Sequence, residues 1–146
     1  MQILVDADAC PVKEIIVKHA KRKGIPVTML IDTAHQLNDG YSHVITVDKG
    51  VDSVDFALIK RLKCDDIVVT GDYGLAAMVL GKGAKAINQN GLIYTDANIE
   101  RLLMERHLSA KARRAGNRTK GPSKRTKADN DRFEATFERL LSSNEM

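Results

Sequence analysis

The feature that most constrains this chain is an alternation of short apolar runs with segments of helical periodicity. Five runs of four or five residues have the composition of buried strands: Gln2–Asp6, Val27–Ile31, Val44–Val47, Ile67–Thr70 and Ala84–Ile87. Helical spacing of apolar residues marks residues 11–23, 53–63, 75–80 and 97–114. Strands that alternate with helices form parallel sheets covered by helices on both faces. The chain of 146 residues therefore predicts a single three-layer α/β domain.

The charge distribution divides the chain into a domain and a tail. Residues 1–110 hold 13 Lys and Arg against 14 Asp and Glu, whereas residues 111–127 hold eight Lys and Arg and no acid. We assign residues 1–114 to the α/β domain and residues 115–146 to a basic, partly mobile C-terminal segment. Phe133, Phe137, Leu140 and Leu141 predict a short helix over residues 132–141, which docks on the domain or on a partner.

Acidic side chains follow the predicted strands. Asp6 and Asp8 close the first strand, and Pro11 fits the first position of the helix after it. Asp48 follows the third strand and Asp72 the fourth. Because the carboxyl ends of parallel strands lie along one edge of a sheet, these acids can converge. Alone, each has a simpler explanation, as a helix cap or a turn residue.

Asp55 makes the convergence more specific. It falls on the inward stripe of its helix, where a charge is costly unless it is paired or coordinated. Carboxylates close together repel one another, and Mg²⁺ or Mn²⁺ relieves that repulsion. We therefore predict a metal-binding and catalytic set of Asp6, Asp8, Asp55 and Asp72, supported by Asp52 and Thr70. Asp65, Asp66 and Asp39 have the pattern of ordinary surface turn residues.

The basic segment suggests a polyanionic partner. Its cations are Lys111, Arg113, Arg114, Arg118, Lys120, Lys124, Arg125 and Lys127. Such a run can neutralise nucleic-acid phosphates, although it carries no aromatic residues for base stacking. The alternative is a solvated tail. Cys10 is expected to be a small buried residue rather than a nucleophile, and His19 a core histidine.

Composition and the N-terminus indicate the compartment. No apolar run approaches the ~20 residues that a membrane helix needs. The chain begins directly with a strand and shows no secretory leader. Its two cysteines form no disulfide framework. These features predict a cytoplasmic protein without a membrane partner.

Two motifs carry a family resemblance. Val5-Asp6-Ala7-Asp8-Ala9-Cys10-Pro11-Val12 resembles the opening motif of the YaiI/YqxD family, and Thr70-Gly71-Asp72-Tyr73-Gly74-Leu75-Ala76 its second motif. The family is uncharacterised but is grouped with the PIN-like superfamily, which consists largely of metal-dependent ribonucleases. The resemblance implies a PIN-like fold with acids at Asp6, Asp55 and Asp72. The helix acid of that superfamily is often Glu, and here it is Asp.

Three functions are compatible with these features. The first is a Mg²⁺- or Mn²⁺-dependent nuclease that hydrolyses RNA phosphodiester bonds. The second is a phosphatase of the haloacid-dehalogenase type, since an Asp-x-Asp after the first strand also opens that class, with Asp6 as nucleophile and Asp8 as acid/base. The third is a non-catalytic module that binds nucleic acid or protein through its basic segment.

Overall fold

The fold is built on a five-stranded sheet in which every neighbouring pair is parallel. The computed structural model describes residues 1–32, 37–48, 53–116 and 124–143. The strands are β1 (Ile3–Asp6), β2 (Val27–Asp32), β3 (His43–Val47), β4 (Ile67–Val69) and β5 (Lys85–Ile87). The predicted α/β class and the parallel sheet are confirmed.

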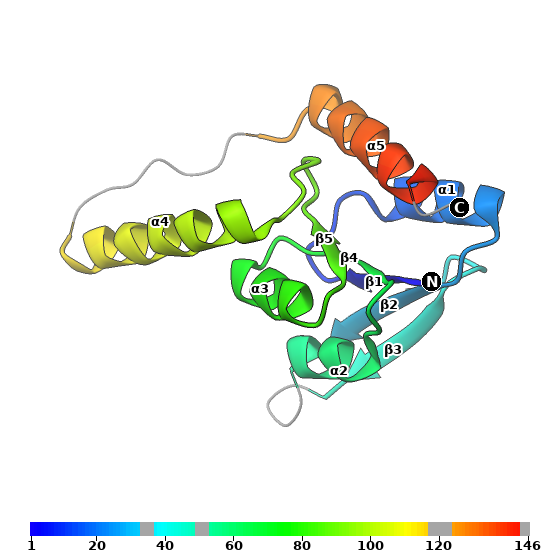
Figure 1. Cartoon of the computed structure of the whole chain (residues 1–146), viewed down its shortest axis with the longest axis horizontal. Coiled ribbons are helices and arrows are strands. Elements are labelled where there is room, and N and C mark those ends of the chain that lie inside the picture. Colours follow the sequence, from blue (N-terminus) through cyan, green and yellow to red (C-terminus); the bar gives the residue numbers. More distant parts are fainter. Residues whose placement is uncertain (33–36, 49–52, 117–123, 144–146) are drawn as a thin grey trace.

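Helices cover both faces of the sheet (Figure 1). They are α1 (Lys13–Lys23), α2 (Val54–Arg61), α3 (Tyr73–Gly81), α4 (Asp96–Arg114) and α5 (Lys127–Ser142). Side chains alternate between the faces along a strand. Ile3 and Val5 of β1 accordingly join the core under α1 and α5, while Leu4 joins the core under α2, α3 and α4. The three layers follow from this alternation.

The strand order β3-β2-β1-β4-β5 fixes where a ligand would bind. The chain moves outward from β1 to β3 on one side and returns to place β4 and β5 on the other. The order therefore reverses between β1 and β4, and ligands of open α/β sheets bind at such a switch point, beyond the carboxyl ends of the strands. Asp6 ends β1, and Thr70 follows β4 directly.

Helix α5 is longer than the sequence pattern predicted and packs on the domain. It begins at Lys127, five residues before the expected start at residue 132, because Thr126 and Asp129 form a capping box. Its large apolar residues, Phe133, Phe137, Leu140 and Leu141, are buried in the core that contains α1 and one face of β1. Figure 1 shows α5 lying over α1. This helix therefore completes the cover on that face of the sheet.

Two other expectations need correction. Pro11 does not occupy the first position of α1, which begins at Lys13, because the preceding residues form a turn in which the Cys10 N–H donates to the Ala7 carbonyl. Asp66 is not a surface turn residue but is buried. Its carboxylate accepts hydrogen bonds from the Gln2 backbone and side chain and from the Lys63 N–H, which ties β1 to the start of β4.

Helix α4 extends away from the body of the molecule (Figure 1). Only Ile99 and Leu102, both in its N-terminal half, are buried. Met104 and Leu108 are more than half exposed. In the described parts of the chain, no helix has both the length and the apolar character needed to cross a membrane.

Candidate active-site cleft

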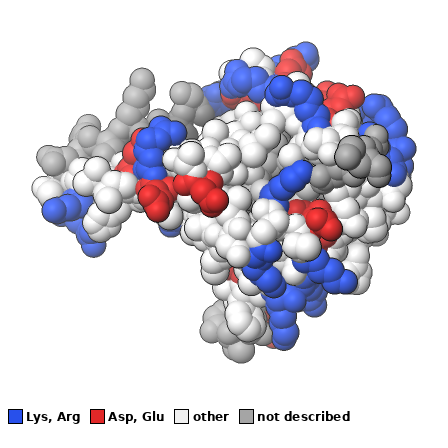
Figure 2. All heavy atoms as spheres, in the orientation of Figure 1, with Lys and Arg blue, Asp and Glu red and all other residues white. Residues whose placement is uncertain are grey.

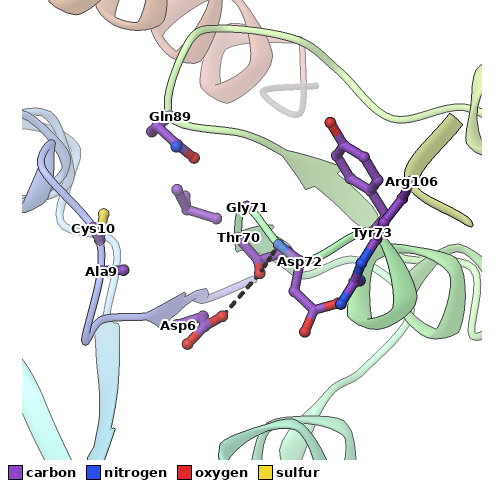
Figure 3. Close-up of a pocket in the computed structure, with 10 residues that line it drawn as sticks. Asp6, Ala9, Cys10, Thr70, Gly71, Asp72, Tyr73, Gln89 and Arg106 are labelled. Atoms are coloured by element: carbon purple, nitrogen blue, oxygen red, sulfur yellow. Dashed lines mark hydrogen bonds and ion pairs between the residues drawn. The ribbon is translucent and has the colours of Figure 1, made fainter. Parts of the chain in front are cut away.

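A cleft of about 390 Å³ opens at the switch point between β1 and β4 (Figure 3). It is lined by Asp6, Ala9, Cys10, Val69, Thr70, Gly71, Asp72, Tyr73, Gln89 and Arg106. The lining comes from the ends of β1 and β4, from the loops after β1, β4 and β5, from the first residue of α3 and from one side chain of α4. The topology thus brings together two acids that are 66 residues apart in the sequence, Asp6 and Asp72.

Thr70 links these two acids. Its hydroxyl donates to the Asp6 carboxylate over 3.0 Å and accepts from the Asp72 N–H over 3.0 Å. The Tyr94 hydroxyl, itself buried, donates to the Thr70 carbonyl over 3.1 Å. Thr70 is only 2% exposed, so it contacts both acids from the floor of the cleft and leaves the cleft open. The Thr70 hydroxyl therefore contacts both acids, and its supporting role in a metal site stays a prediction.

The carboxylates act on one another electrostatically. Burial is the main cause that raises the pKa of Asp6 above its usual value, and the charges of Asp55, Asp72 and Asp8 raise it further. The hydrogen bond from Thr70 opposes this shift. Burial and the charge of Asp72 likewise raise the pKa of Asp55. Asp6, Asp55 and Asp72 are therefore close enough for their negative charges to repel one another, and a nearby cation would relieve this repulsion.

Asp72 has a structural role in addition to its place in the cleft. It is the N-cap of α3, and its Oδ1 accepts from the N–H groups of Gly74 and Leu75 over 2.9 and 3.2 Å. The same oxygen lies 3.6 Å from Nη1 of Arg106 on α4. The simpler explanation of Asp72 as a local turn or cap residue is thus correct and does not exclude a role in the cleft.

The remaining predicted acids lie elsewhere or outside the described residues. Asp8 accepts a hydrogen bond from the Asp32 N–H at the end of β2, 3.1 Å from its Oδ2. Asp55 lies in the first turn of α2 and is half-buried, not fully inward. Asp48 is exposed. Asp52 falls outside the described residues, and Ser53 caps α2.

The donor set can be compared with the needs of a divalent cation. Within the described ranges, no three His, Cys, Asp or Glu side chains are grouped so that they could hold an ion together. Mg²⁺ does not need such a cage, since one or two carboxylates with waters and substrate phosphate oxygens suffice. Asp6 and Asp55 are half-buried carboxylates whose pKa values are raised by burial and by neighbouring acids, and with Asp72 beside an open cleft they fit an ion of this partly hydrated kind.

Sequence reasoning did not identify Arg106, Tyr73 or Gln89 as cleft residues. Arg106 is one of several cations on a long helix, so no local pattern distinguishes it. Gln89 packs closely on Gly71, where an added Cβ would lie 3.0 Å from its Oε1. Cys10 also lines the cleft, and burial raises the pKa of its thiol, which disfavours the nucleophilic thiolate.

His19 is the core histidine that the sequence predicted. It is 3% exposed, and its Nε2 lies 3.0 Å from the Glu134 carboxylate of α5. Its ring meets Phe137 edge to face. The residue therefore belongs to the packing between α1 and α5 rather than to the cleft.

The basic segment is divided between two helices. Lys111, Arg113 and Arg114 end α4, whereas Lys124, Arg125 and Lys127 surround the start of α5. The guanidinium group of Arg125 donates to Gln89, Asn90 and Asn130 and thereby braces the loop after β5. Arg118 and Lys120 lie outside the described residues. Figure 2 shows Lys and Arg in separate groups on the visible face, with acidic groups between them.

Replacing Thr70 by Val should raise the pKa of Asp6 further, because the hydrogen bond from the Thr70 hydroxyl, which lowers this pKa, is lost. Thr70→Ser retains the hydroxyl and is the matched control. Titration of the Asp6 carboxyl carbon by NMR measures the effect. An unchanged Asp6 pKa in Thr70→Val would show that this hydrogen bond does not form in solution.

The fold and the cleft together define a class of protein. A parallel sheet with an acidic cleft at its switch point belongs to the open α/β proteins, whose ligands bind at the carboxyl ends of the strands. The model of the uncharacterized BCR, YaiI/YqxD family matches residues 4–143. The chain therefore belongs to this family, as its two motifs predicted, and the match extends through α5.

Curated relatives and one solved structure show similarity over most of the chain. A UPF0178 protein of Ruminiclostridium cellulolyticum is 69% identical over 134 residues, which cover 92% of this chain and 88% of that protein. A UPF0178 protein of Clostridium acetobutylicum is 56% identical over 97% of both chains. The crystal structure of Rae1 (YacP) from Bacillus subtilis aligns with 98% of this chain and 99% of that one, at 17% identity and a TM-score of 0.45.

Proposed function

We propose that this protein hydrolyses phosphodiester bonds of nucleic acid, with RNA as the expected substrate, in a reaction that depends on Mg²⁺ or Mn²⁺. The observation that carries the proposal is the placement of Asp6 and Asp72 in one cleft at the switch point, with Asp55 of α2 near enough for its charge to act on Asp6. The charges of Asp55 and Asp72 raise the pKa of Asp6, and the charge of Asp72 raises the pKa of Asp55. Carboxylates placed in this way at an open cleft are suited to a cation that also binds substrate phosphate.

The residues have distinct roles in this proposal. Asp6 and Asp72 would hold the cation, with Asp55 adding negative charge from α2 and Asp8 from the loop after β1. The cation would supply charge stabilisation to the phosphoryl oxygens during hydrolysis. The Thr70 hydroxyl fixes the position of the Asp6 carboxylate relative to the Asp72 backbone, because it hydrogen-bonds to both. The cations that end α4 and precede α5 would contact the nucleic-acid backbone.

Cleavage of a fluorescein-labelled RNA in Mn²⁺ or Mg²⁺ and in excess EDTA tests the proposal. We expect metal-dependent cleavage by the wild-type protein and strong loss in Asp55→Asn, because a charge that acts on the site is removed. Asp65→Asn is the control, since Asp65 is exposed and precedes β4 at the opposite edge of the sheet.

Measurements of phosphate-ester turnover and of RNA binding, made beside the RNA cleavage assay, separate the alternative functions. Turnover of a phosphate monoester with inhibition by beryllofluoride, but no RNA cleavage, would favour the phosphatase. The hydrogen bond from the Asp32 N–H to Asp8 directs that carboxylate towards β2, which does not favour its use as an acid/base beside Asp6. Salt-sensitive RNA binding without cleavage in Mn²⁺ would favour the non-catalytic module and contradict the proposed hydrolysis.

A further inference from the structure

A second hollow lies beside the cleft and shares one residue with it. This groove, of about 710 Å³, runs along α4 and is lined by Leu103, Arg106, His107, Ala110, Arg113 and Arg114. Arg106 also lines the acidic cleft. Its side chain is 59% exposed, and its guanidinium lies 3.6 Å from the Asp72 carboxylate. Arg106 therefore stands where the two hollows meet.

The two hollows have opposite electrostatic character. Three arginines and one histidine are among the six residues that line the groove. The cleft holds Asp6 and Asp72, and the charge of Asp55 acts on Asp6. A polyanion would be attracted to the groove and repelled by the acids unless a cation accompanied it. Among the described residues that line the cleft, Arg106 is the one with a positive side chain.

We propose that the groove on α4 binds the phosphodiester backbone of a single-stranded nucleic acid and leads it into the cleft. Arg106 exchanges its Asp72 partner for a backbone phosphate as the strand enters. The inference rests on the proposed function because it takes the acidic cleft as the destination of the strand. A single strand is the occupant, since a cleft of about 390 Å³ equals a cube about 7 Å on a side, and a B-form duplex is wider than its major groove of about 12 Å.

Arg106 acts here as a positioning residue, and binding without metal tests its role. The probe is a fluorescein-labelled oligouridine of about 20 nucleotides, a length that spans several phosphate contacts. Its anisotropy is followed in EDTA at several salt concentrations. We expect Arg106→Gln to bind about 3–10-fold more weakly and to reduce the slope of log K against log salt by about 0.7, the loss of one phosphate contact on a single strand.

Arg101→Gln is the matched control. Arg101 lies on the same helix, is exposed and pairs with Glu105 at 3.5 Å, but it lines neither hollow. We expect its affinity to remain within about twofold of wild type, since a cation outside the groove makes no phosphate contact. Equal losses in Arg101→Gln and Arg106→Gln, or wild-type affinity and slope in Arg106→Gln, would overturn the inference.

A double-mutant cycle tests the exchange of partners. Asp72→Asn retains a good N-cap for α3 and releases Arg106 from its ion pair. We expect Asp72→Asn to tighten RNA binding more in the wild-type background than in Arg106→Gln. The same fold-change in both backgrounds would overturn the exchange.

These outcomes remain distinct from those of the hydrolysis assay. Absence of RNA binding in EDTA would overturn the inference, whatever the protein does to RNA in Mn²⁺. Binding that depends on Arg106, in a protein that cleaves no RNA in Mn²⁺, would support the groove and contradict only the proposed hydrolysis.

Discussion

Asp6→Asn should reduce metal-dependent RNA cleavage by at least about 100-fold, the upper end of the loss seen when a residue that supports a metal site is removed. Asp6 is the acid on which the charges of Asp55, Asp72 and Asp8 converge. The amide oxygen of Asn can still accept the Thr70 hydroxyl, so the local hydrogen bond is retained. Initial cleavage rates in Mn²⁺ measure the effect, with Asp65→Asn as the control.

The same variant should be more stable than wild type at pH 7. Because the pKa of Asp6 is raised in the folded state, the folded protein binds this proton more tightly than the unfolded chain. Stability is therefore lost as pH rises from the usual value of 3.8 through the raised pKa. Asn does not titrate, so the advantage of Asp6→Asn should grow across this window and then level off.

Urea unfolding between pH 3.5 and pH 8 measures that advantage. Each 1 kcal/mol of added stability corresponds to about 2–4 °C in Tm for a chain of this size, so the sign of the change is also visible in thermal unfolding. A variant that is less active but more stable than wild type is expected where catalysis requires an arrangement of charges that destabilises the fold. An Asp6→Asn protein with wild-type cleavage, or one less stable than wild type across the whole pH range, would contradict the account of the cleft.

Phe137→Ala should lower the free energy of unfolding by about 3–5 kcal/mol, the usual cost of deleting a buried aromatic ring. Phe137 is fully buried on α5 and stacks on Phe133 at a centroid distance of 5.1 Å. Its ring also meets His19 of α1. The loss is a large fraction of the 5–15 kcal/mol that stabilises a typical domain, so the whole sheet should be affected.

Equilibrium urea denaturation followed by circular dichroism measures this loss. Arg139→Ala on the same helix is the control, because Arg139 is exposed and its guanidinium donates to the hydroxyl of the nearby Thr136. A loss below about 1 kcal/mol in Phe137→Ala would show that α5 does not share the core of the domain in solution.

The strands and the family were predicted correctly, because both depend on short patterns within one segment of the sequence. Apolar runs such as Ile3–Asp6 and Ile67–Val69 are strands because both of their faces are buried under helices. The convergence of Asp6 with Asp72 followed from topology, since parallel strands end at one edge. Family motifs in the same two segments gave the correct family.

Long-range packing determined what the sequence did not predict. Arg106 reaches the cleft only because α4 packs against α3, which Asp72 caps. Asp66 is buried because the N-terminus of β1 lies beside it and donates hydrogen bonds. Residues far apart in the sequence make these contacts, so spacing within one segment carries no signal for them.

The central claim is that the acids at the switch point hold a divalent cation. A crystal structure of the protein with Mn²⁺ and a single-stranded oligonucleotide, with data collected for anomalous scattering, tests it most directly. The account predicts an anomalous peak within about 2.5 Å of carboxylate oxygens of Asp6 and Asp72, with a substrate phosphate beside it. An ordered cleft without such a peak, at Mn²⁺ concentrations that saturate any activity, would contradict the account.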